Sequence, residues 1–159
     1  MTVKQLWFGL MLSFLICFAA SGIGAFSTTS QIDGWYATLN RPSYAPPNWI
    51  FGPLWTILYA MMAVAAWLVW KQEGFWKAAA PLGIFAVQLI LNVIWSVLFF
   101  GLQNPGIALI EIILLWMAIF ATIILFARRS MPAGILLVPY LLWVSFASVL
   151  NYGFWSLNP

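Results

Sequence analysis

The chain has 159 residues, of which 65% are hydrophobic and 6% are charged, and its formal net charge at pH 7 is +3. Soluble domains carry about 25% charged residues. Folding at this length buries only about 70% of the surface of the unfolded chain, and six basic and three acidic side chains cannot cover the rest. The composition therefore excludes a water-soluble globule and a disordered chain, so lipid must be the outer solvent of the folded protein.

The residue inventory excludes several kinds of chemistry. The sequence has no histidine, which is the commonest general base and a frequent ligand of zinc and haem. Its one cysteine, Cys17, allows neither an intrachain disulfide nor a Cys-x-x-Cys site. The basic residues are scattered, so they form no patch for nucleic acid. We therefore expect no metal, no required cofactor and no nucleic-acid partner.

Five apolar stretches are each long enough to cross the hydrocarbon layer as a helix, which takes about 20 residues. They cover residues 5–26, 49–70, 78–100, 106–127 and 133–155. The stretches do not alternate as the strands of a β-barrel would, and the short connections favour antiparallel neighbours. The predicted fold class is an all-α integral membrane protein. We expect a single domain over residues 1–159, built as a five-helix transmembrane bundle with an ordered loop at residues 27–48.

Basic residues are divided unequally between the two ends of the predicted bundle. One end carries Lys4, Lys71, Lys77, Arg128 and Arg129, whereas the other carries only Arg41. Lys and Arg collect in cytoplasmic loops. We therefore expect the N-terminus in the cytoplasm, with the first loop and the C-terminus on the opposite side.

The third predicted helix carries a polar stripe inside the membrane. Gln88, Asn92 and Ser96 are four residues apart and share one helix face, and Trp95 lies beside them. An unpaired amide is costly in hydrocarbon, so this face must meet other helices or a ligand. Two interpretations stay open, namely hydrogen bonds between helices or a stripe that also lines a pocket.

The fifth predicted helix has a face that matches this stripe. Pro139 should bend this helix because it removes one backbone hydrogen bond, and a bend opens space between helices. A lining of aromatic, amide and small side chains suits a flat, hydrophobic ligand with a few polar atoms. The residues of this face are Tyr140, Trp143, Ala147, Leu150 and Asn151.

Two further features lie inside the predicted spans. Trp95, Trp116 and Trp143 are predicted deep in the membrane, where an indole N–H needs a partner because lipid offers none. Glu111 is the only charge well inside a span, and a carboxylate there is a functional candidate by default. Its position near the membrane boundary also lets it reach the interface, stay protonated or cap a neighbouring helix.

The first loop, residues 34–49, is too aromatic for a plain linker. Its prolines limit the freedom of the chain, so the loop can become ordered at low entropic cost. Arg41 is its lone cation and Asp33 is close in sequence. One interpretation is an interfacial loop with a local ion pair. The other is a lid over the bundle that offers aromatic rings and the Arg41 guanidinium to a ligand carboxylate.

Three separated motifs support a family resemblance. The loop and second helix read Trp35-Tyr36-x-x-Leu39-x-Arg41-Pro42-Ser43-x-x-Pro46-Pro47, followed by Trp55. The third helix reads Asn92-x-x-Trp95-Ser96-x-x-Phe99-Phe100-Gly101, and the fifth reads Val138-Pro139-Tyr140-Leu141-x-Trp143 through Leu150-Asn151-Tyr152. In this order, over about residues 5–157, they resemble the tryptophan-rich sensory protein family (TspO/MBR), also called translocator protein or peripheral benzodiazepine receptor.

The resemblance implies a five-helix bundle in the lipid bilayer that often pairs as a homodimer. It also implies binding of porphyrins and haem precursors, of isoquinoline or benzodiazepine ligands and, in some members, of cholesterol. The ligand would lie between the helices under the first loop, with Arg41 as a candidate partner for its carboxylate. The other ligand-binding residues, carried over by position, are Tyr36, Trp55, Gln88, Asn92, Trp95, Trp143, Ala147, Leu150 and Asn151.

One departure from the family pattern concerns cholesterol. Animal members end the fifth helix with a recognition pattern in which a basic residue follows a tyrosine. Here Tyr152 is followed by residues 153–159, which contain no Lys or Arg. Although this pattern is weak even when complete, its absence argues against steroid binding and favours a protein of the bacterial cell membrane.

Three functions are compatible with the sequence. The first is a membrane receptor for porphyrins and related tetrapyrroles, with a sensory, transport or stress-related role. The second is a light- and oxygen-dependent enzyme that degrades porphyrins through aromatic radicals, for which Tyr36, Trp55 and Trp143 are the catalytic candidates. The third is a small proton-coupled transporter that uses Glu111. Binding ranks above catalysis because the sequence offers no constellation of acid, base and metal.

Overall fold

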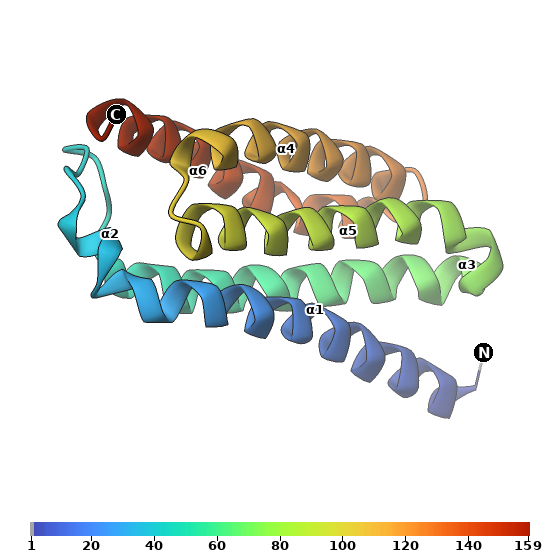
Figure 1. Ribbon diagram of the computed structural model, residues 1–159. Coiled ribbons are helices and arrows are strands. Elements are labelled where there is room, and N and C mark those ends of the chain that lie inside the picture. Colours follow the sequence, from blue (N-terminus) through green and yellow to red (C-terminus); the bar gives the residue numbers. More distant parts are fainter. Residues whose placement is uncertain (1) are drawn as a thin grey trace.

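The computed structural model describes residues 2–159, which are mostly helical and contain no strand (Figure 1). The elements are α1 (Val3–Ile32), α2 (Trp35–Thr38), the 3₁₀ turn η1 (Asn48–Ile50), α3 (Phe51–Ser96), the π-helical η2 (Val97–Gly101), α4 (Pro105–Ala127), α5 (Met131–Leu136) and α6 (Val138–Leu157). Four segments in this range are long and apolar enough to cross a membrane: Val3–Ile32, Asn48–Gly101, Pro105–Ala127 and Met131–Leu157. The expected all-helical membrane protein is thereby confirmed.

Helix α1 is longer than the sequence predicted. It begins after a capping box, in which the Thr2 hydroxyl accepts from the Gln5 amide and the Gln5 side chain accepts from the Thr2 amide. The apolar stretch predicted its end near residue 26, where four Ser and Thr residues follow. Instead it continues to Ile32, since no Gly or Pro interrupts it there and the Thr28 hydroxyl donates to the Gly24 carbonyl within the helix.

Helix α3 contains a reversal at Gly74. The predicted helices at 49–70 and 78–100 were expected to be joined by a short loop, but helical structure continues on both sides of this one glycine. Gly74 has φ 70° and ψ 171°, a backbone conformation that is essentially restricted to glycine. Figure 1 shows the chain turning back on itself there. We call residues 51–73 the first arm of α3 and residues 75–96 the second arm.

The last predicted helix, 133–155, is divided into α5 and α6. Leu137 separates them, and Pro139 follows in the first turn of α6. The expected bend is therefore present as a break, because proline has no N–H to donate and its ring restricts the residue before it. The loop before α4 ends at Asn104, whose side chain accepts from the Ile107 amide at 3.0 Å and caps that helix.

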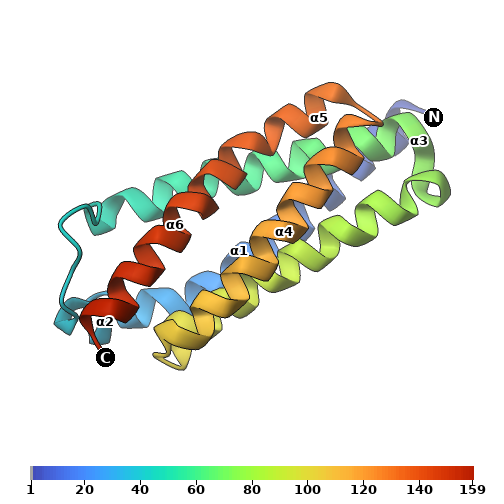
Figure 2. The ribbon, with the colours of Figure 1, turned by 90° about the horizontal axis from the view of Figure 1, so that it is seen from above.

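The helices form one bundle, in which α4 packs against α3 and α6 (Figure 2). Helix α1 runs obliquely across α3. Near its start it contacts the first arm, where Gly9 lies against the Trp70 ring and the Trp67 indole donates to the Leu6 carbonyl at 3.0 Å. Near its end it contacts the second arm, where Gly24 lies against Ser96. The crossing separates α1 from the beginning of the first arm, which matters for the site below.

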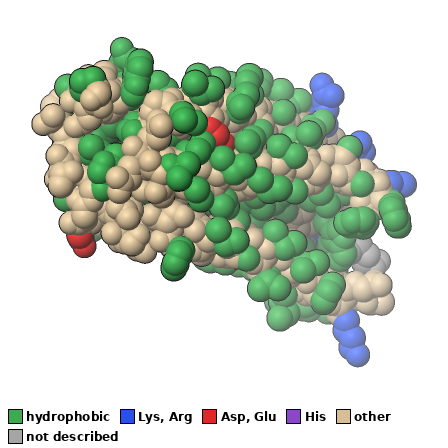
Figure 3. All heavy atoms as spheres, viewed as in Figure 1, with side chains coloured by type: hydrophobic (Ala, Val, Ile, Leu, Met, Phe, Trp, Pro, Cys, Tyr) green, Lys and Arg blue, Asp and Glu red, His purple; other side chains and the backbone are tan. Residues whose placement is uncertain are grey.

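The outer surface of the bundle is apolar. Hydrophobic side chains cover most of the visible face in Figure 3, and the Lys and Arg side chains seen there lie at the end where α1 begins. Phe26, Trp49 and Trp76 are exposed by 84%, 73% and 88%. A soluble protein rarely exposes so much contiguous apolar surface, so this face is suited to lipid.

We expect Gly74→Ala to destabilise the protein by about 1–3 kcal/mol, because a side chain is strained in this backbone region. Gly83→Ala is the matched control, since Gly83 is helical, exposed and has open space around a built Cβ; it should be neutral or stabilise by up to about 1 kcal/mol. The measurement is the thermal unfolding midpoint in detergent. Equal midpoints for the two variants would contradict the assigned role of Gly74.

Candidate ligand-binding cavity

The bundle encloses a cavity of about 260 Å³ next to the loop between α1 and α3. Its wall is built by α1, α2, the two arms of α3, η2 and α6, so residues far apart in the sequence meet there. Nine of the lining residues are aromatic, and nine, two of them tyrosines, carry an amide or hydroxyl group. The lining residues are Ser21, Gly24, Ala25, Thr28, Thr29, Ile32, Tyr36, Phe51, Gly52, Trp55, Thr56, Tyr59, Asn92, Trp95, Ser96, Phe99, Phe100, Trp143, Ala147, Leu150, Asn151 and Phe154.

Asn92 forms a buried bridge between three helical segments. The Tyr59 hydroxyl of the first arm donates to Asn92 Oδ1 at 2.8 Å, and Asn92 Nδ2 donates to the Tyr140 hydroxyl of α6 at 2.7 Å. The Ser96 hydroxyl donates to the Asn92 carbonyl at 3.4 Å. Both interpretations of the polar stripe therefore hold for Asn92, which joins helices by hydrogen bonds and also lies in the cavity wall.

A second polar connection holds Trp95. Its indole N–H donates to Asn151 Oδ1 at 3.0 Å, and Asn151 Nδ2 donates to the Pro105 carbonyl at 2.7 Å. The Trp95 ring stacks on Phe99 with the ring centres 5.4 Å apart. These contacts fix the plane of the indole, so the cavity wall at this point is rigid before any ligand binds.

Trp143 differs from the other deep tryptophans. Its Nε1 is buried and has no hydrogen-bond partner among residues 2–159, although the ring lines the cavity and meets Phe51 edge to face at 5.9 Å. Trp116, by contrast, donates to the Ser145 hydroxyl at 2.8 Å and lies outside the cavity. A buried donor without a partner costs about 1–3 kcal/mol, so the Trp143 N–H is an unsatisfied donor in this structure.

Trp55 lies in the wall between two tyrosines. Its ring centre is 5.7 Å from Tyr59 and 6.1 Å from Tyr140. Because both tyrosines are held by Asn92, the position of Trp55 depends on the same bridge. Ala147 lines the wall formed by α6 and is the small residue among these rings.

Helix α2 in the first loop contributes Tyr36 to the cavity. The Tyr36 ring is buried, and its centre lies 4.9 Å from Phe154 and 5.5 Å from Phe100. Burial raises the pKa of the Tyr36 hydroxyl above its ordinary value, and the Arg41 charge opposes this shift. Tyr36 is therefore neutral at physiological pH and serves as a hydrogen-bonding group.

Two residues predicted from the sequence to bind ligand lie outside the cavity wall. Arg41 is exposed; its guanidinium lies 5.4 Å from the Tyr36 ring centre and donates to the Pro46 carbonyl and to Asn48 Oδ1. Gln88 is buried deeper in the bundle, with Nε2 3.8 Å from Met62 Sδ. The helical turn between Gln88 and Asn92 is enough to take Gln88 below the cavity floor.

The local ion pair considered for Arg41 and Asp33 is absent. Within the described part of the chain, the one ion pair joins Arg129 to Glu73 at 3.1 Å, at the other end of the bundle. Arg41 instead closes the loop on itself through its two hydrogen bonds. It therefore shapes the lid and stacks on a ring that belongs to the cavity.

Sequence reasoning missed the wall contributed by α1. All of its cavity residues except Ile32 are small or hydroxylated, among them Ser21, Ala25 and Thr28, and they recur every three or four positions. That spacing marks one helix face and could have identified them. Four phenylalanines were also missed, namely Phe51, Phe99, Phe100 and Phe154.

Glu111 does not line the cavity. It is only 7% exposed, and neither of its carboxylate oxygens has a hydrogen-bond partner within residues 2–159. It neither reaches the interface nor caps a neighbouring helix, which were two of the roles considered for it.

The apolar outer surface and the aromatic cavity within the bundle together define a helical integral membrane protein with an internal cavity. Comparison with known proteins identifies the family. The model of the TspO/MBR family matches residues 13–156, which is most of the chain. The chain therefore belongs to the TspO/MBR family, as the three motifs indicated.

Relatives are similar over most of their length. The chain is 47% identical to the tryptophan-rich protein TspO of Chlorobaculum tepidum, over 91% of this chain and 92% of the relative. It is 41% identical to the translocator protein of Ovis aries, over 85% and 83%, and 38% identical to the tryptophan-rich sensory protein of Cereibacter sphaeroides, over 91% and 90%.

We expect Asn92→Leu to lower the free energy of unfolding by about 1–3 kcal/mol, because it leaves the Tyr59 and Tyr140 hydroxyls buried without a partner. Ser148→Ala is the control, since the Ser148 hydroxyl donates only to the Val144 carbonyl in its own helix and should cost much less. Thermal unfolding in detergent measures both. A loss for Asn92→Leu no larger than that for Ser148→Ala would show that the bridge contributes little.

Proposed function

We propose that this protein is a membrane receptor that binds porphyrins and related tetrapyrroles in the cavity beneath the first loop. Membership of the TspO/MBR family supports a membrane receptor or sensory role. The ligand class is argued from the site. The observation that carries it is a wall of fixed indole and phenyl rings in which the Trp143 N–H has no partner.

This lining suits a flat aromatic ligand for two reasons. Rings such as Trp95 and Phe99 present faces and edges on which another π-system can stack. The amide and hydroxyl groups of the wall fix orientation by hydrogen bonding with polar atoms of the ligand. A planar, largely apolar macrocycle with a few nitrogen and oxygen acceptors satisfies both conditions.

The lid adds a cation close to the cavity. Arg41 stacks on Tyr36, whose ring lines the wall. Because Arg41 itself is exposed, its guanidinium can pair with a carboxylate that projects from the cavity toward the aqueous side. An acidic tetrapyrrole has its charged groups at one edge, which matches an apolar cavity beneath a cationic lid.

We also propose that the chain crosses the membrane five times. The apolar segment Asn48–Gly101 reverses at Gly74, so each arm of α3 forms one span. With α1, α4 and the α5–α6 segment this makes five. Lys4, Lys71, Lys77, Arg128 and Arg129 then share the cytoplasmic end. An odd number of spans places the two termini on opposite sides.

This arrangement predicts the behaviour of fusions in a bacterial host. Green fluorescent protein at the N-terminus should fluoresce, because it folds in the cytoplasm. Alkaline phosphatase at the C-terminus should be active, because it folds only outside the cytoplasm. An inactive C-terminal phosphatase together with a fluorescent C-terminal green fluorescent protein would contradict the fifth span, since four spans place both ends on the same side.

The binding proposal is tested with protoporphyrin and the purified protein in detergent. We expect saturable quenching of tryptophan fluorescence. Ala147→Phe should weaken binding at least about tenfold, because the added ring occupies the cavity. Val149→Phe is the matched control: it makes a similar change on α6 at an exposed position outside the cavity and should bind like the unaltered protein.

Two results would contradict the proposal. One is the absence of saturable quenching by the unaltered protein. The other is an unchanged dissociation constant for Ala147→Phe when its unfolding midpoint shows that it is folded. Illumination of the bound porphyrin distinguishes binding from the enzyme hypothesis, in which Trp55 and Trp143 would react. If the porphyrin bleaches, and changing both tryptophans to Phe slows the bleaching, degradation is favoured over simple binding.

A further inference from the structure

The end of the cavity that faces the loop is closed by a latch between the loop and α6. The Asn40 amide donates to Asn158 Oδ1 at 2.9 Å, and Asn158 Nδ2 donates back to the Asn40 carbonyl at 3.1 Å. The Tyr44 hydroxyl donates to the Val149 carbonyl at 3.2 Å, and Gly153 lies against Tyr44. Four polar or close contacts therefore hold the loop down over the end of the bundle.

The side of the cavity between α1 and the first arm of α3 is different. Four lining residues are exposed, and all four lie on these two segments: Ala25 and Thr29 on α1, and Gly52 and Thr56 on the first arm. Every other lining residue is buried or half-buried. The cavity therefore reaches the outer surface at this one place.

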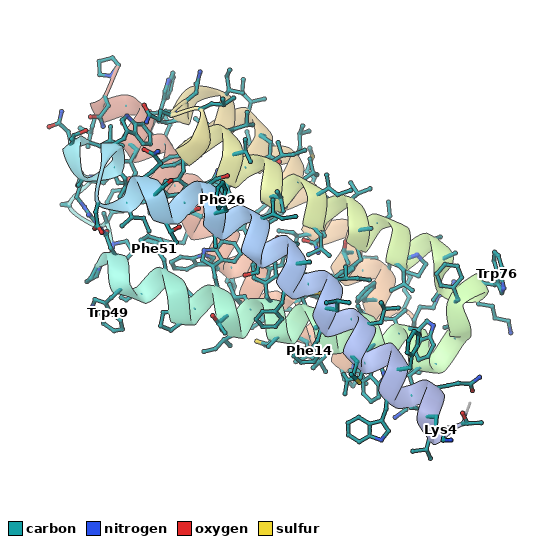
Figure 4. The ribbon with its side chains drawn as sticks, turned by 60° about the horizontal axis from the view of Figure 1, so that its bottom comes forward. Lys4, Phe14, Phe26, Trp49, Phe51 and Trp76 are labelled. Carbon is teal, nitrogen blue, oxygen red and sulfur yellow. The ribbon has the colours of Figure 1, made fainter. Side chains whose placement is uncertain are left out.

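The path of α1 explains why the opening is there. Helix α1 contacts the first arm near Gly9, but near Gly24 and Ser27 it has moved to Ser96 and Gly101 beyond the first arm. Figure 4 shows this oblique crossing, with Phe51 at the start of the first arm beside the space that α1 leaves. The residues on the rim are small, and a Cβ added to Gly52 would meet no atom within 4 Å.

The opening is flanked by exposed apolar side chains. Phe26, next to Ala25, is 84% exposed, and Ile57, next to Thr56, is 56% exposed. The Thr56 hydroxyl donates to the Gly52 carbonyl at 2.9 Å within its own helix, so its polar group is already satisfied. A rim of small residues flanked by exposed apolar side chains is suited to the passage of an apolar molecule from lipid.

We propose that the gap between α1 and the first arm of α3, rimmed by Ala25, Thr29, Gly52 and Thr56, is the entrance through which the ligand passes between the bilayer and the cavity. This inference rests on the proposed function, because it needs an apolar ligand that partitions into lipid. The size of the rim sets the rates of association and dissociation, whereas the inner wall sets the affinity.

The test uses the full chain in phosphatidylcholine nanodiscs with protoporphyrin dissolved in the bilayer, and stopped-flow quenching of tryptophan fluorescence. We expect Gly52→Phe and Thr29→Phe each to slow association at least about tenfold, with dissociation slowed by a similar factor. Gly22→Phe is the matched control, since Gly22 lies on α1, is exposed, has open space around a built Cβ and does not line the cavity. It should leave both rates unchanged.

A further variant separates this route from access under the loop. Asn158→Ala removes the two hydrogen bonds between Asn40 and Asn158 from the latch without touching the rim, so we expect an unchanged association rate. Faster association for Asn158→Ala, with no effect of Gly52→Phe, would overturn the side entrance and favour the loop. Faster dissociation alone in Gly52→Phe would also overturn it, because the new ring would then only be competing for the cavity.

If the unaltered protein shows no saturable binding, the proposed function itself fails; if it binds and the rim variants keep its rates, only the entrance fails.

Discussion

In hydrocarbon every polar group must find its partner inside the protein, and this constraint organises the whole molecule. Asn92 meets it by accepting from Tyr59 and donating to Tyr140, and in doing so it joins the two arms of α3 to α6. Asn151 meets it by joining Trp95 to the start of α4. These buried amides tie together helices whose remaining contacts are mostly apolar, apart from hydrogen bonds such as the one from the Trp116 indole to the Ser145 hydroxyl.

The same bridges leave a cavity instead of a filled core. Each amide holds a large ring at a fixed place, and fixed rings cannot collapse into the space between them. Gly9 and Gly24 let α1 approach one arm of α3 at each end, which sets its oblique path and keeps it away from the beginning of the first arm. Because α1 is held close to α3 at Gly9 and at Gly24, it lies apart from the beginning of the first arm. In the proposed entrance, this separation is where the cavity opens to the side.

The tryptophans of this chain serve different physical purposes that composition alone does not distinguish. Trp76 is exposed at the turn between the arms of α3, where an indole suits the boundary between water and lipid. Trp95 and Trp116 are held by hydrogen bonds inside the bundle. Trp143 has a buried donor without a partner on the cavity wall. Only this last arrangement costs stability in the empty protein, and a ligand acceptor would recover that cost.

Much of this architecture follows from the sequence because the physics is local. Apolar runs of membrane-spanning length, the break before Pro139 and the shared face of Asn92 and Ser96 each depend on residues that are near one another in the chain. The grouping of Trp55, Asn92 and Trp143 was expected from the family motifs, and the structure brings them to one wall. The sequence by itself therefore determined the membrane class, the helices and part of the polar and aromatic lining.

Only the tertiary structure decided which side chains reach the cavity and where it opens. Gln88 and Asn92 are equivalent in spacing, but one helical turn of depth separates a buried contact with Met62 from the cavity wall. Arg41 lies outside the cavity wall, where its hydrogen bonds to its own loop hold it in the segment that covers the cavity. The path of α1 depends on contacts between residues about 60 positions apart, such as Leu6 and Trp67. Such contacts depend on how helices cross, and helix crossing is set by the fit of whole surfaces, which no local pattern in the chain records.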